Sequence, residues 1–586
     1  MEQRERGSGQ NFLHGALILA VSAFVVKLIG AFFKVPLANI LGGGGMGYFM
    51  TAYDLFNPVR SLAIAGIPVA VSKMVSESIA TGRPADARRT FRASVLIMSV
   101  TGVLGSMIVY RFGGSFARLA GNPGASAAVI SIAPAIFCCC IISAYRGYYE
   151  GQRNMYPTAV SQVFEALVKL ICGIGFAGYV YTTGVNSYTR TGVIFGVFAR
   201  DADTAAAVLA QYTAAAAIWG VSISTFAAML FLMARHALVG RGERAAVTAA
   251  APRRSYASIS AEILRTAVPV CLGSLTVSMG SLVDLFTVMN RLSSAISPDP
   301  AYFLERYAAV LNGGMELSQL PNYLYGSYTG LALTIFGIVP AVTAVFGISA
   351  LPNVAAAWKV RDRQRTHANI TAVLRIVSIL AIPAGLGISV LSRPILELFF
   401  DGRQQEIGVA APLLSVLGIA VIFVSLTAPI NSMLQGIGRM DLPVKLMAIG
   451  AAIKAAVNLF LLGVPRIGIA AAPVGTLLCY LFIVIASLHA ITRETGVTLS
   501  FGNTFGRPLL AAVACAAGAY FSYYRLLAWL LPGTSNHIFT LLSIGIGANI
   551  YLILLFVLRI VTKDDILLLP EGKKILKILE KWHVIG

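Results

Sequence analysis

Long, nearly uncharged apolar runs dominate this chain and restrict what it can fold into. Most of them extend over about 20 residues and are separated by short polar segments. A helix of about 20 residues spans the hydrocarbon core of a bilayer, whereas a barrel strand needs only about 10 residues with strict alternation. Because 57% of the residues are hydrophobic and only 12% are charged, the chain is predicted to be an all-α integral membrane protein.

Hydropathy predicts about fourteen transmembrane helices. The first is interpreted as an uncleaved helix and not as a secretory signal, because it is long, contains Lys27 and is not followed by a small-residue cleavage site. The predicted spans are residues 12–33, 47–70, 91–110, 126–145, 157–181, 206–234, 262–290, 320–346, 368–391, 408–428, 443–463, 467–490, 508–530 and 538–561.

The distribution of positive charge predicts the orientation. If the N-terminus is cytoplasmic, the inner segments hold 28 of the 45 Lys and Arg residues and the outer loops hold 11, with span-edge residues counted in the adjacent loop. The positive-inside rule then places both termini in the cytoplasm. The formal charge of +20 is read as a topology signal that also favours membrane lipids, and nothing in the sequence points to nucleic acid.

Two stretches 285 residues apart resemble each other. Gly151 is followed by Lys169 at eighteen residues, and Gly436 is followed by Lys454 at the same spacing. The offset corresponds to six spans, an even number, which predicts two parallel-repeat six-helix lobes with a substrate path between them. The predicted division is residues 1–240 for the N-terminal lobe, 241–261 for a cytoplasmic linker, 262–490 for the C-terminal lobe, and 491–586 for helices 13 and 14 with a basic cytoplasmic tail.

Charged residues at bilayer depth are costly and normally face a protein interior or a wet cavity. Lys27 and Lys34 are seven residues apart and so share one face of the first helix, while Asp54 and Arg60 lie within the second predicted span. One reading is a water-filled cavity with net positive charge that suits an anionic ligand. The alternative is that Asp54 pairs with one of the lysines and only holds the two helices together.

Other buried charges are assigned by their spacing. Asp284, Lys454 and Asn458 are predicted to be the second lobe's contribution to the cavity. Glu165 and Lys169 are four residues apart with the acid first, the favourable order for a local ion pair, so a structural pair is predicted there.

Several chemistries find no support in the sequence. The seven cysteines all fall inside predicted spans with no disulfide or metal-ligand spacing, and no phosphate-binding loop motif, catalytic residue or cofactor site is identified. An ion-coupled drug or cation exporter should line its cavity with unpaired acids, but bases outnumber acids within the spans. A membrane glycosyltransferase or ligase should carry catalytic acids or His on a large outer loop, and the largest, about residues 291–319, contains no His.

Extended blocks of the chain resemble one transporter family. They are LGGGGMGYFMTAYDLFNPVRSLAIAGIPVAVSKMVSE, YRGYYEGQRNMYPTAVSQVFEALVKL, LVDLFTVMNRL, YGSYTGLALTIFGIVPA and LQGIGRMDLPVKLMAIGAAIKAAVNLFL followed by GIAAAPVGT. Together they are similar to the polysaccharide-flippase branch of the multidrug/oligosaccharidyl-lipid/polysaccharide exporter superfamily. Within it they resemble the stage V sporulation protein B type, related to the MurJ lipid II flippases. The resemblance covers about residues 12–490.

This resemblance implies a fourteen-helix, two-lobe flippase, which is expected to be a monomer in the bacterial cytoplasmic membrane. Its substrate would be an undecaprenyl-diphosphate-linked saccharide moved to the outer leaflet by alternating access, and it leaves a coupling ion, Na⁺ or H⁺, open. In lipid II flippases a basic cluster on the first two helices binds the diphosphate. Lys27 falls at one such position and Arg60 lies close to another, whereas Phe33 and Lys34 replace a basic-acidic pair of that pattern.

Overall fold

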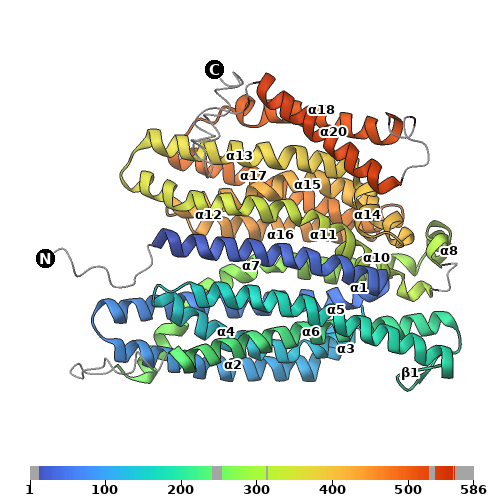
Figure 1. Ribbon diagram of the computed structural model, residues 1–586, viewed down its shortest axis with the longest axis horizontal. Helices are drawn as coiled ribbons and strands as arrows, with labels where there is room; N and C mark the ends of the chain where they lie inside the picture. The colour runs from blue at the N-terminus through green and yellow to red at the C-terminus, as the bar shows by residue number, and fades with distance from the viewer. Residues whose placement is uncertain are drawn as a thin grey trace. The chain divides into compact units, whose positions relative to one another are not determined.

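The computed structural model describes residues 12–239, 254–311, 315–526, 529, 535–558 and 560, most of which are helical (Figure 1). Within these residues, eleven helices are long and apolar enough to cross a membrane, or twelve if a bent pair at Gly337 forms one span. The all-α membrane fold predicted from the sequence is therefore confirmed.

The first helix explains part of the difference between this count and fourteen. Residues 12–33 and 47–70 were predicted as two spans with a loop between them, whereas the structure has one helical segment, α1 (Phe12–Ala80), interrupted at Gly42. Gly42 has φ 61° and ψ −175°, a conformation that glycine adopts without steric cost. Because a straight helix of this length would measure about 100 Å, α1 comprises two consecutive spans. The total of fourteen stays a prediction.

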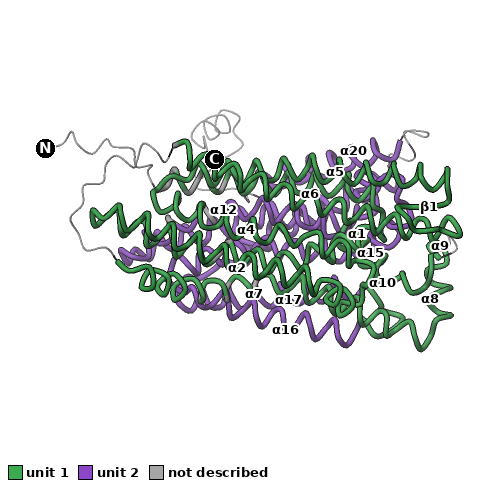
Figure 2. The backbone as a smooth tube through the Cα atoms, turned by 90° about the horizontal axis from the view of Figure 1, so that it is seen from below, with its two compact units in different colours: residues 1–330, 462–469 green, residues 331–461, 470–586 purple. Residues whose placement is uncertain are grey.

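The chain divides into two compact units, coloured separately in Figure 2. Unit 1 comprises residues 1–330 and 462–469, and unit 2 comprises residues 331–461 and 470–586. The predicted lobe boundary lay at residues 241–261, but α7 (Tyr256–Ile296) belongs to unit 1 because it packs along α1. The division into repeat halves stays a prediction.

Unit 1 is built from long helices that pack side by side, with short elements between them. Proline residues begin several of them, because a helix's first turn does not need the missing N–H group. The remaining elements of unit 1 are α2 (Pro84–Leu119), α3 (Ser126–Ser131), α4 (Ala133–Gly151), α5 (Tyr156–Thr191), β1 (Val193–Ile194), β2 (Val197–Phe198), α6 (Ala202–Val239), α8 (Pro300–Arg306), α9 (Ala308–Leu311) and α10 (Leu320–Ser327).

Helices α5 and α6 extend beyond the spans predicted at 157–181 and 206–234 and run side by side to their common end (Figure 1). There they are joined by an antiparallel hairpin in which Val193 pairs with Phe198. The two turn residues, Phe195 and Gly196, both have positive φ, as a two-residue hairpin turn requires.

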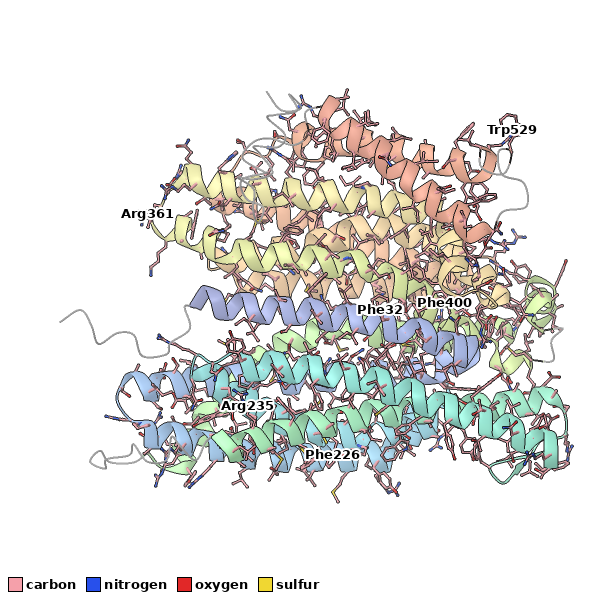
Figure 3. All side chains as sticks on the ribbon, in the orientation of Figure 1. Phe32, Phe226, Arg235, Arg361, Phe400 and Trp529 are labelled. Atoms are coloured by element: carbon pink, nitrogen blue, oxygen red, sulfur yellow. The ribbon has the colours of Figure 1, made fainter. Side chains whose placement is uncertain are left out.

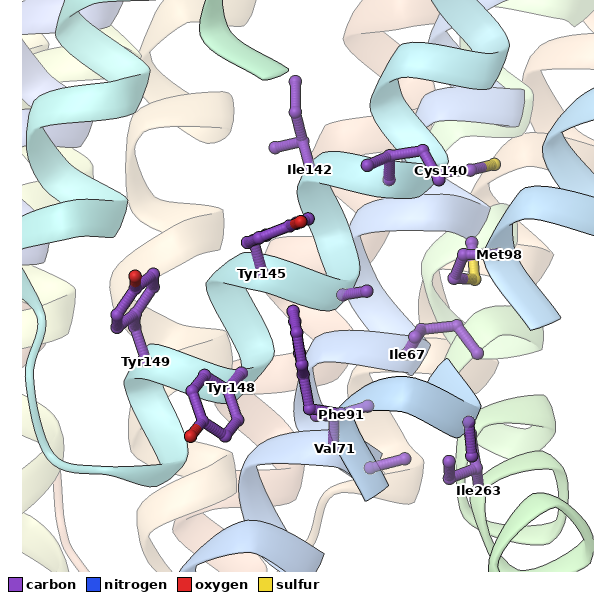
Figure 4. Packing of buried hydrophobic residues seen from close by; sticks show 14 of the residues in the cluster. Ile67, Val71, Phe91, Met98, Cys140, Ile142, Tyr145, Tyr148, Tyr149 and Ile263 are labelled. Carbon is purple, nitrogen blue, oxygen red and sulfur yellow. The ribbon is translucent and has the colours of Figure 1, made fainter. Parts of the chain in front are cut away.

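An aromatic core lies between α2, α4 and α6 (Figure 4). The ring centroid of Phe91 lies 4.7 Å from that of Tyr148, 5.0 Å from Tyr145 and 4.6 Å from His236. Tilted and edge-on ring pairs at these distances add to the stability that burial provides. This core fixes the turn of α4 that also carries a buried base, Arg146.

Glycines bring α1 and α10 into backbone contact. A Cβ atom at Gly326 would overlap the carbonyl oxygen of Gly43, and one at Gly47 would overlap Asn322. The amide of Asn322 donates to the Gly44 carbonyl at 2.8 Å. Small residues of this kind let two helices approach closely in a membrane, where packing and polar contacts replace the hydrophobic effect.

The described part of unit 2 contains helices joined by short turns and loops, and no strand. Its core lies between α12, α13, α15 and α17 and is lined by aliphatic side chains. The elements are α11 (Leu333–Phe336), α12 (Ile338–Lys359), α13 (Arg363–Val390), α14 (Ser392–Phe399), α15 (Gln404–Gly436), α16 (Asp441–Leu461), α17 (Ala471–Thr495), α18 (Arg507–Phe521) and α20 (Asn536–Val557).

Large apolar side chains are exposed along the helices, as expected where lipid is the solvent. Phe32 of α1 is 68% exposed and Phe226 of α6 is 48% exposed (Figure 3). The predicted basic tails at the two ends of the chain, and most of the predicted linker at 241–261, lie outside the described residues.

Candidate functional site

A row of aromatic side chains follows α1 across its kink. The ring centroids of Phe33 and Phe49 are 6.0 Å apart, Phe49 stacks on Tyr53 at 5.6 Å, and Tyr53 lies 6.3 Å from Phe56. Residues 49, 53 and 56 share one helix face because they are spaced by four and three positions. This row holds Tyr53 in a fixed position and forms one wall of the site.

Three bases surround Tyr53. Lys34 and Arg60 come from α1 and Lys169 from α5, and all three lie within electrostatic range of the Tyr53 phenol. Lys169 hydrogen-bonds to Tyr53, and its Nζ lies 5.4 Å from the ring centroid of Phe33 and 5.8 Å from that of Tyr53. Cation–π contacts of this kind hold an ammonium group in place without neutralising it. Lys34, Arg60 and Lys169 are called the three-base site below.

The predicted Glu165–Lys169 ion pair is replaced by a pair from another helix. Glu165 Oε2 accepts from Arg146 Nη2 of α4 at 3.0 Å, and Arg146 Nε donates to Ser161 Oγ at 3.0 Å. The planar guanidinium can serve a carboxylate and a hydroxyl at once, which an ammonium on a flexible stem does less well. Glu165 is therefore paired with Arg146, while Arg60 and Lys169 also lie within electrostatic range of it and Lys169 contacts the aromatic row.

Asp54 lies on the same segment of α1 and is 5% exposed. Its Oδ2 accepts a hydrogen bond from Tyr325 Oη of α10 at 2.6 Å, and Asn57 also hydrogen-bonds to it. Lys34 and the buried Asp284 of α7 lie within electrostatic range of Asp54. In the part of the chain that the structure describes, Lys34 and Asp54 form no direct ion pair, which disfavours a purely structural role for this lysine.

Bases outnumber acids among the described residues of this cluster, by four to three. Arg146 is matched by Glu165, which also lies within electrostatic range of Arg60 and Lys169. The seven groups are Lys34, Arg60, Arg146, Lys169, Asp54, Glu165 and Asp284.

The structure brings together four of the seven residues predicted to line the cavity, namely Lys34, Asp54, Arg60 and Asp284. Lys27 is exposed on α1 and is not among the groups that act on this cluster. Lys454 and Asn458 are buried on α16 in unit 2, next to Gly475 of α17. Their part in a common cavity with the unit 1 residues stays a prediction.

Sequence reasoning missed three residues of the cluster: Tyr53, Arg146 and Tyr325. Arg146 was placed in a loop because the predicted span ended at 145, whereas α4 continues to Gly151 and leaves Arg146 only 2% exposed. The signal that could have found it is that no proline occurs between residue 145 and Pro157. Tyrosines within apolar runs carry no local signal for a polar role.

Metal-binding groups are absent from the described ranges: no cluster of three or more His, Cys, Asp or Glu residues is placed to hold an ion. All seven cysteines are free thiols. One of them, Cys139 of α4, hydrogen-bonds to Arg60 and so takes part in the wall behind the three-base site. The fixed positive charges and hydroxyl donors of this cluster can bind anions.

Many apolar spans and a buried cluster of bases indicate a polytopic membrane protein. The chain belongs to the polysaccharide biosynthesis protein family, whose profile matches residues 12–334. The profile of the lipid II flippase MurJ matches residues 308–540. The family resemblance predicted from the sequence is confirmed.

Individual relatives agree with this assignment. The chain is 23% identical to the Bacillus subtilis (strain 168) lipid II flippase MurJ, covering 76% of each chain. It is also 23% identical to stage V sporulation protein B of the same organism, covering 96% of this chain and 98% of the relative. The solved inward closed conformation of the lipid II flippase MurJ matches with a TM-score of 0.64 at 13% identity, covering 92% of this chain and 98% of that one.

A second kind of transporter shares the fold. The inward-facing conformation of a multidrug resistance MATE family transporter of the MOP superfamily matches with a TM-score of 0.58 at 14% identity. That likeness covers 82% of this chain and 98% of the other. The chain therefore shares its fold with the lipid II flippase structure and with this multidrug transporter.

Proposed function

We propose that this protein moves an undecaprenyl-diphosphate-linked saccharide from the inner to the outer leaflet of the bacterial cytoplasmic membrane by alternating access. The proposal places both termini in the cytoplasm and treats the protein as a transporter that acts as a monomer. It is supported by relatives named as flippases, and by the 28 to 11 division of basic residues predicted between the two membrane sides.

One observation carries the proposal: the three-base site around Tyr53 at bilayer depth. Lys34, Arg60 and Lys169 converge on one phenol from two helices, and the nearest acids do not match them in number. A diphosphate offers several acceptor oxygens to such donors, and charge-assisted hydrogen bonds to phosphate are stronger than neutral ones. An uncharged sugar would not need this cluster.

A cation or drug exporter is the alternative within the same superfamily. It would bind its ligand with acids left unneutralised in the cavity. In the described part of unit 1, Glu165 is paired with Arg146, and Asp54 accepts hydrogen bonds from Tyr325 and Asn57 with Lys34 near it. Bases outnumber acids among the described residues of the cluster, which supports an anionic ligand.

The test is the binding of a lipid-linked diphosphate to purified full-length protein in nanodiscs. The probe is N-acetylglucosamine joined to a short, water-soluble prenyl chain through a diphosphate. Replacing Lys34, Arg60 or Lys169 by Gln removes one charge-assisted contact, worth about 1.5–3 kcal/mol, and should weaken binding by about 10- to 150-fold.

Arg265→Gln is the matched control, because Arg265 lies in the same unit but is exposed on α7. It should bind the probe like the unchanged protein. Normal binding by all three single variants, with intact folding, would contradict the proposed site. Lys27→Gln tests whether Lys27 also binds the probe, as the sequence predicted. Because Lys27 is exposed, its replacement should weaken probe binding much less than the replacement of Lys34.

A further inference from the structure

Three tyrosines gather at one end of unit 2, where α18 continues into a π-helical turn at Ser522–Leu526. The ring centroids of Tyr520 and Tyr524 lie 4.7 Å apart, and those of Tyr523 and Tyr524 lie 4.8 Å apart. Tyr520 is 49% exposed and Tyr524 is 43% exposed. Turns of this kind widen a helix locally and are frequent at functional sites. Here the turn brings the rings into one cluster that remains partly exposed.

Charged side chains from α14 border these rings. Arg393 Nε donates to Glu397 Oε1 at 2.9 Å, and both residues lie within electrostatic range of Tyr523 and Tyr524. The start of α20 contributes Thr540, which hydrogen-bonds to Tyr523. Helices α14 and α20 meet at this end of the unit (Figure 1). An acid, a base and exposed rings from α14, α18 and its π-helical turn therefore lie together.

A belt of tyrosines at the membrane surface is the ordinary explanation for exposed rings at the end of a spanning helix. It does not account for Glu397, whose side chain is only 15% exposed although that of Arg393 beside it is 60% exposed. Removing most of a carboxylate from water costs free energy, and rings that face lipid gain nothing from a carboxylate beside them. The cluster therefore suits a ligand that uses the rings and the charged groups together.

A saccharide has both kinds of surface. The C–H groups on one face of a pyranose ring carry partial positive charge and pack against the negative face of an aromatic ring. The hydroxyl groups of the sugar donate to a carboxylate and accept from a guanidinium, and each of these charged groups can make several hydrogen bonds at once. Tyr520 and Tyr524 offer the ring faces, and Glu397 and Arg393 offer the hydrogen bonds.

We propose that Tyr520, Tyr524, Arg393 and Glu397 form a saccharide-binding site. The predicted orientation puts this end of unit 2 outside the cell, because the loop between the spans predicted at 508–530 and 538–561 is an outer one. The inference rests on the proposed function and deepens it, since the saccharide of a transferred lipid would occupy the site before release. A free saccharide has the same chemistry, and the experiment separates the two sources.

The experiment is saturation-transfer NMR on the full-length protein in nanodiscs. The probes are the methyl glycosides of N-acetylglucosamine, glucose, galactose and mannose. At least one glycoside should receive saturation, strongest at the C–H protons of one ring face, and protein-free nanodiscs should give none. Titration of that glycoside then gives its dissociation constant for each variant.

Two variants test the two kinds of contact. Tyr524→Ala removes a ring face and should weaken glycoside binding by about 2- to 13-fold. Glu397→Gln exchanges charge-assisted hydrogen bonds for neutral ones and should weaken it by about 5- to 13-fold. Tyr524→Phe keeps the ring and should bind almost like the unchanged protein, which separates stacking from a loss of folding.

Tyr179→Ala is the matched control. Tyr179 is 69% exposed on α5 in unit 1, outside this cluster, so its replacement should leave glycoside binding unchanged. If Tyr524→Ala lowers the unfolding temperature but binds the glycoside normally, the tyrosines are only a membrane belt and the inference is overturned. Normal binding by Glu397→Gln as well would place any saccharide elsewhere.

The outcomes also separate this inference from the proposed function. Absence of saturation in every glycoside with the unchanged protein overturns the inference and leaves the three-base site untouched. If the lipid-linked saccharide is the ligand, the short-chain prenyl-diphosphate N-acetylglucosamine should displace the bound glycoside. If that probe binds nowhere while a glycoside binds and is lost as expected in the variants, the proposed function fails and the site serves a free saccharide.

Discussion

Replacing Arg146 by Met should destabilise the protein far more than its position near a helix end suggests. The guanidinium makes a 3.0 Å ion pair with Glu165 and a 3.0 Å hydrogen bond with Ser161, and its side chain is 3% exposed. Removing one partner of a buried ion pair leaves the other charge uncompensated, which costs about 3–5 kcal/mol. Methionine fills a similar volume, so the loss is chiefly electrostatic.

The assay is thermal unfolding of the purified variants in one detergent, followed as a double-mutant cycle. Arg146→Met alone should lower the unfolding temperature markedly. Adding Glu165→Gln removes the carboxylate charge that Arg146 no longer balances. The unfolding temperature should then recover most of its loss, since a neutral pair of similar volume is often as stable as a buried ion pair. A large coupling between the two changes is therefore expected.

Arg393→Met is the matched control. Arg393 also contacts a glutamate at 2.9 Å, Glu397 one turn along α14, but its side chain is 60% exposed. An exposed ion pair of this kind contributes about 0–1 kcal/mol, so this variant should unfold almost like the original protein. Equal and small effects at Arg146 and Arg393, or no recovery on adding Glu165→Gln, would refute the assignment of Arg146 as the partner of Glu165.

Three further predictions test other parts of the structure. Gly326→Ala places a methyl group against a backbone carbonyl of α1 and should cost about 1–3 kcal/mol, seen as a lower unfolding temperature; an unchanged temperature would contradict the tight α1–α10 contact. In a cysteine-free background, Asn186→Cys should react with an impermeant thiol reagent in intact cells and Thr81→Cys should not, and the reverse labelling would overturn the orientation. Tyr53→Phe keeps the ring but removes the hydrogen bond to Lys169, so probe binding should weaken by about 2- to 13-fold, and a larger loss would point to misfolding.

Local patterns predicted the parts of this structure that depend on local physics. Hydropathy found the spanning helices, because the cost of exposing polar backbone to lipid leaves little choice of structure. The grouping of Lys34, Asp54 and Arg60 was also predictable, since all three lie on the two halves of α1. The loop expected between those halves was wrong because a single glycine at position 42 is enough to kink the helix.

Contacts between distant segments were not predictable from one sequence. Tyr325 lies 271 residues from Asp54, and nothing near either residue marks the other. The spacing of Glu165 and Lys169 is favourable in an isolated helix, but such a pair is worth only about 0.2–0.5 kcal/mol. A buried arginine from α4 offers Glu165 a stronger partner, so tertiary structure overrides the local preference.

Flipping by proteoliposomes that contain the purified protein tests the central claim most directly. A fluorescent undecaprenyl-diphosphate saccharide is placed in both leaflets, and an impermeant quencher reports the rate at which the inner pool becomes accessible. The fluorescence of protein-containing vesicles should be quenched completely, first for lipid in the outer leaflet and then, in a second phase, for lipid flipped from the inner leaflet. Lys34→Gln and Lys169→Gln should slow the second phase by about tenfold or more, and Arg265→Gln should not. Quenching that stops at the outer leaflet, as in protein-free vesicles, would contradict the account.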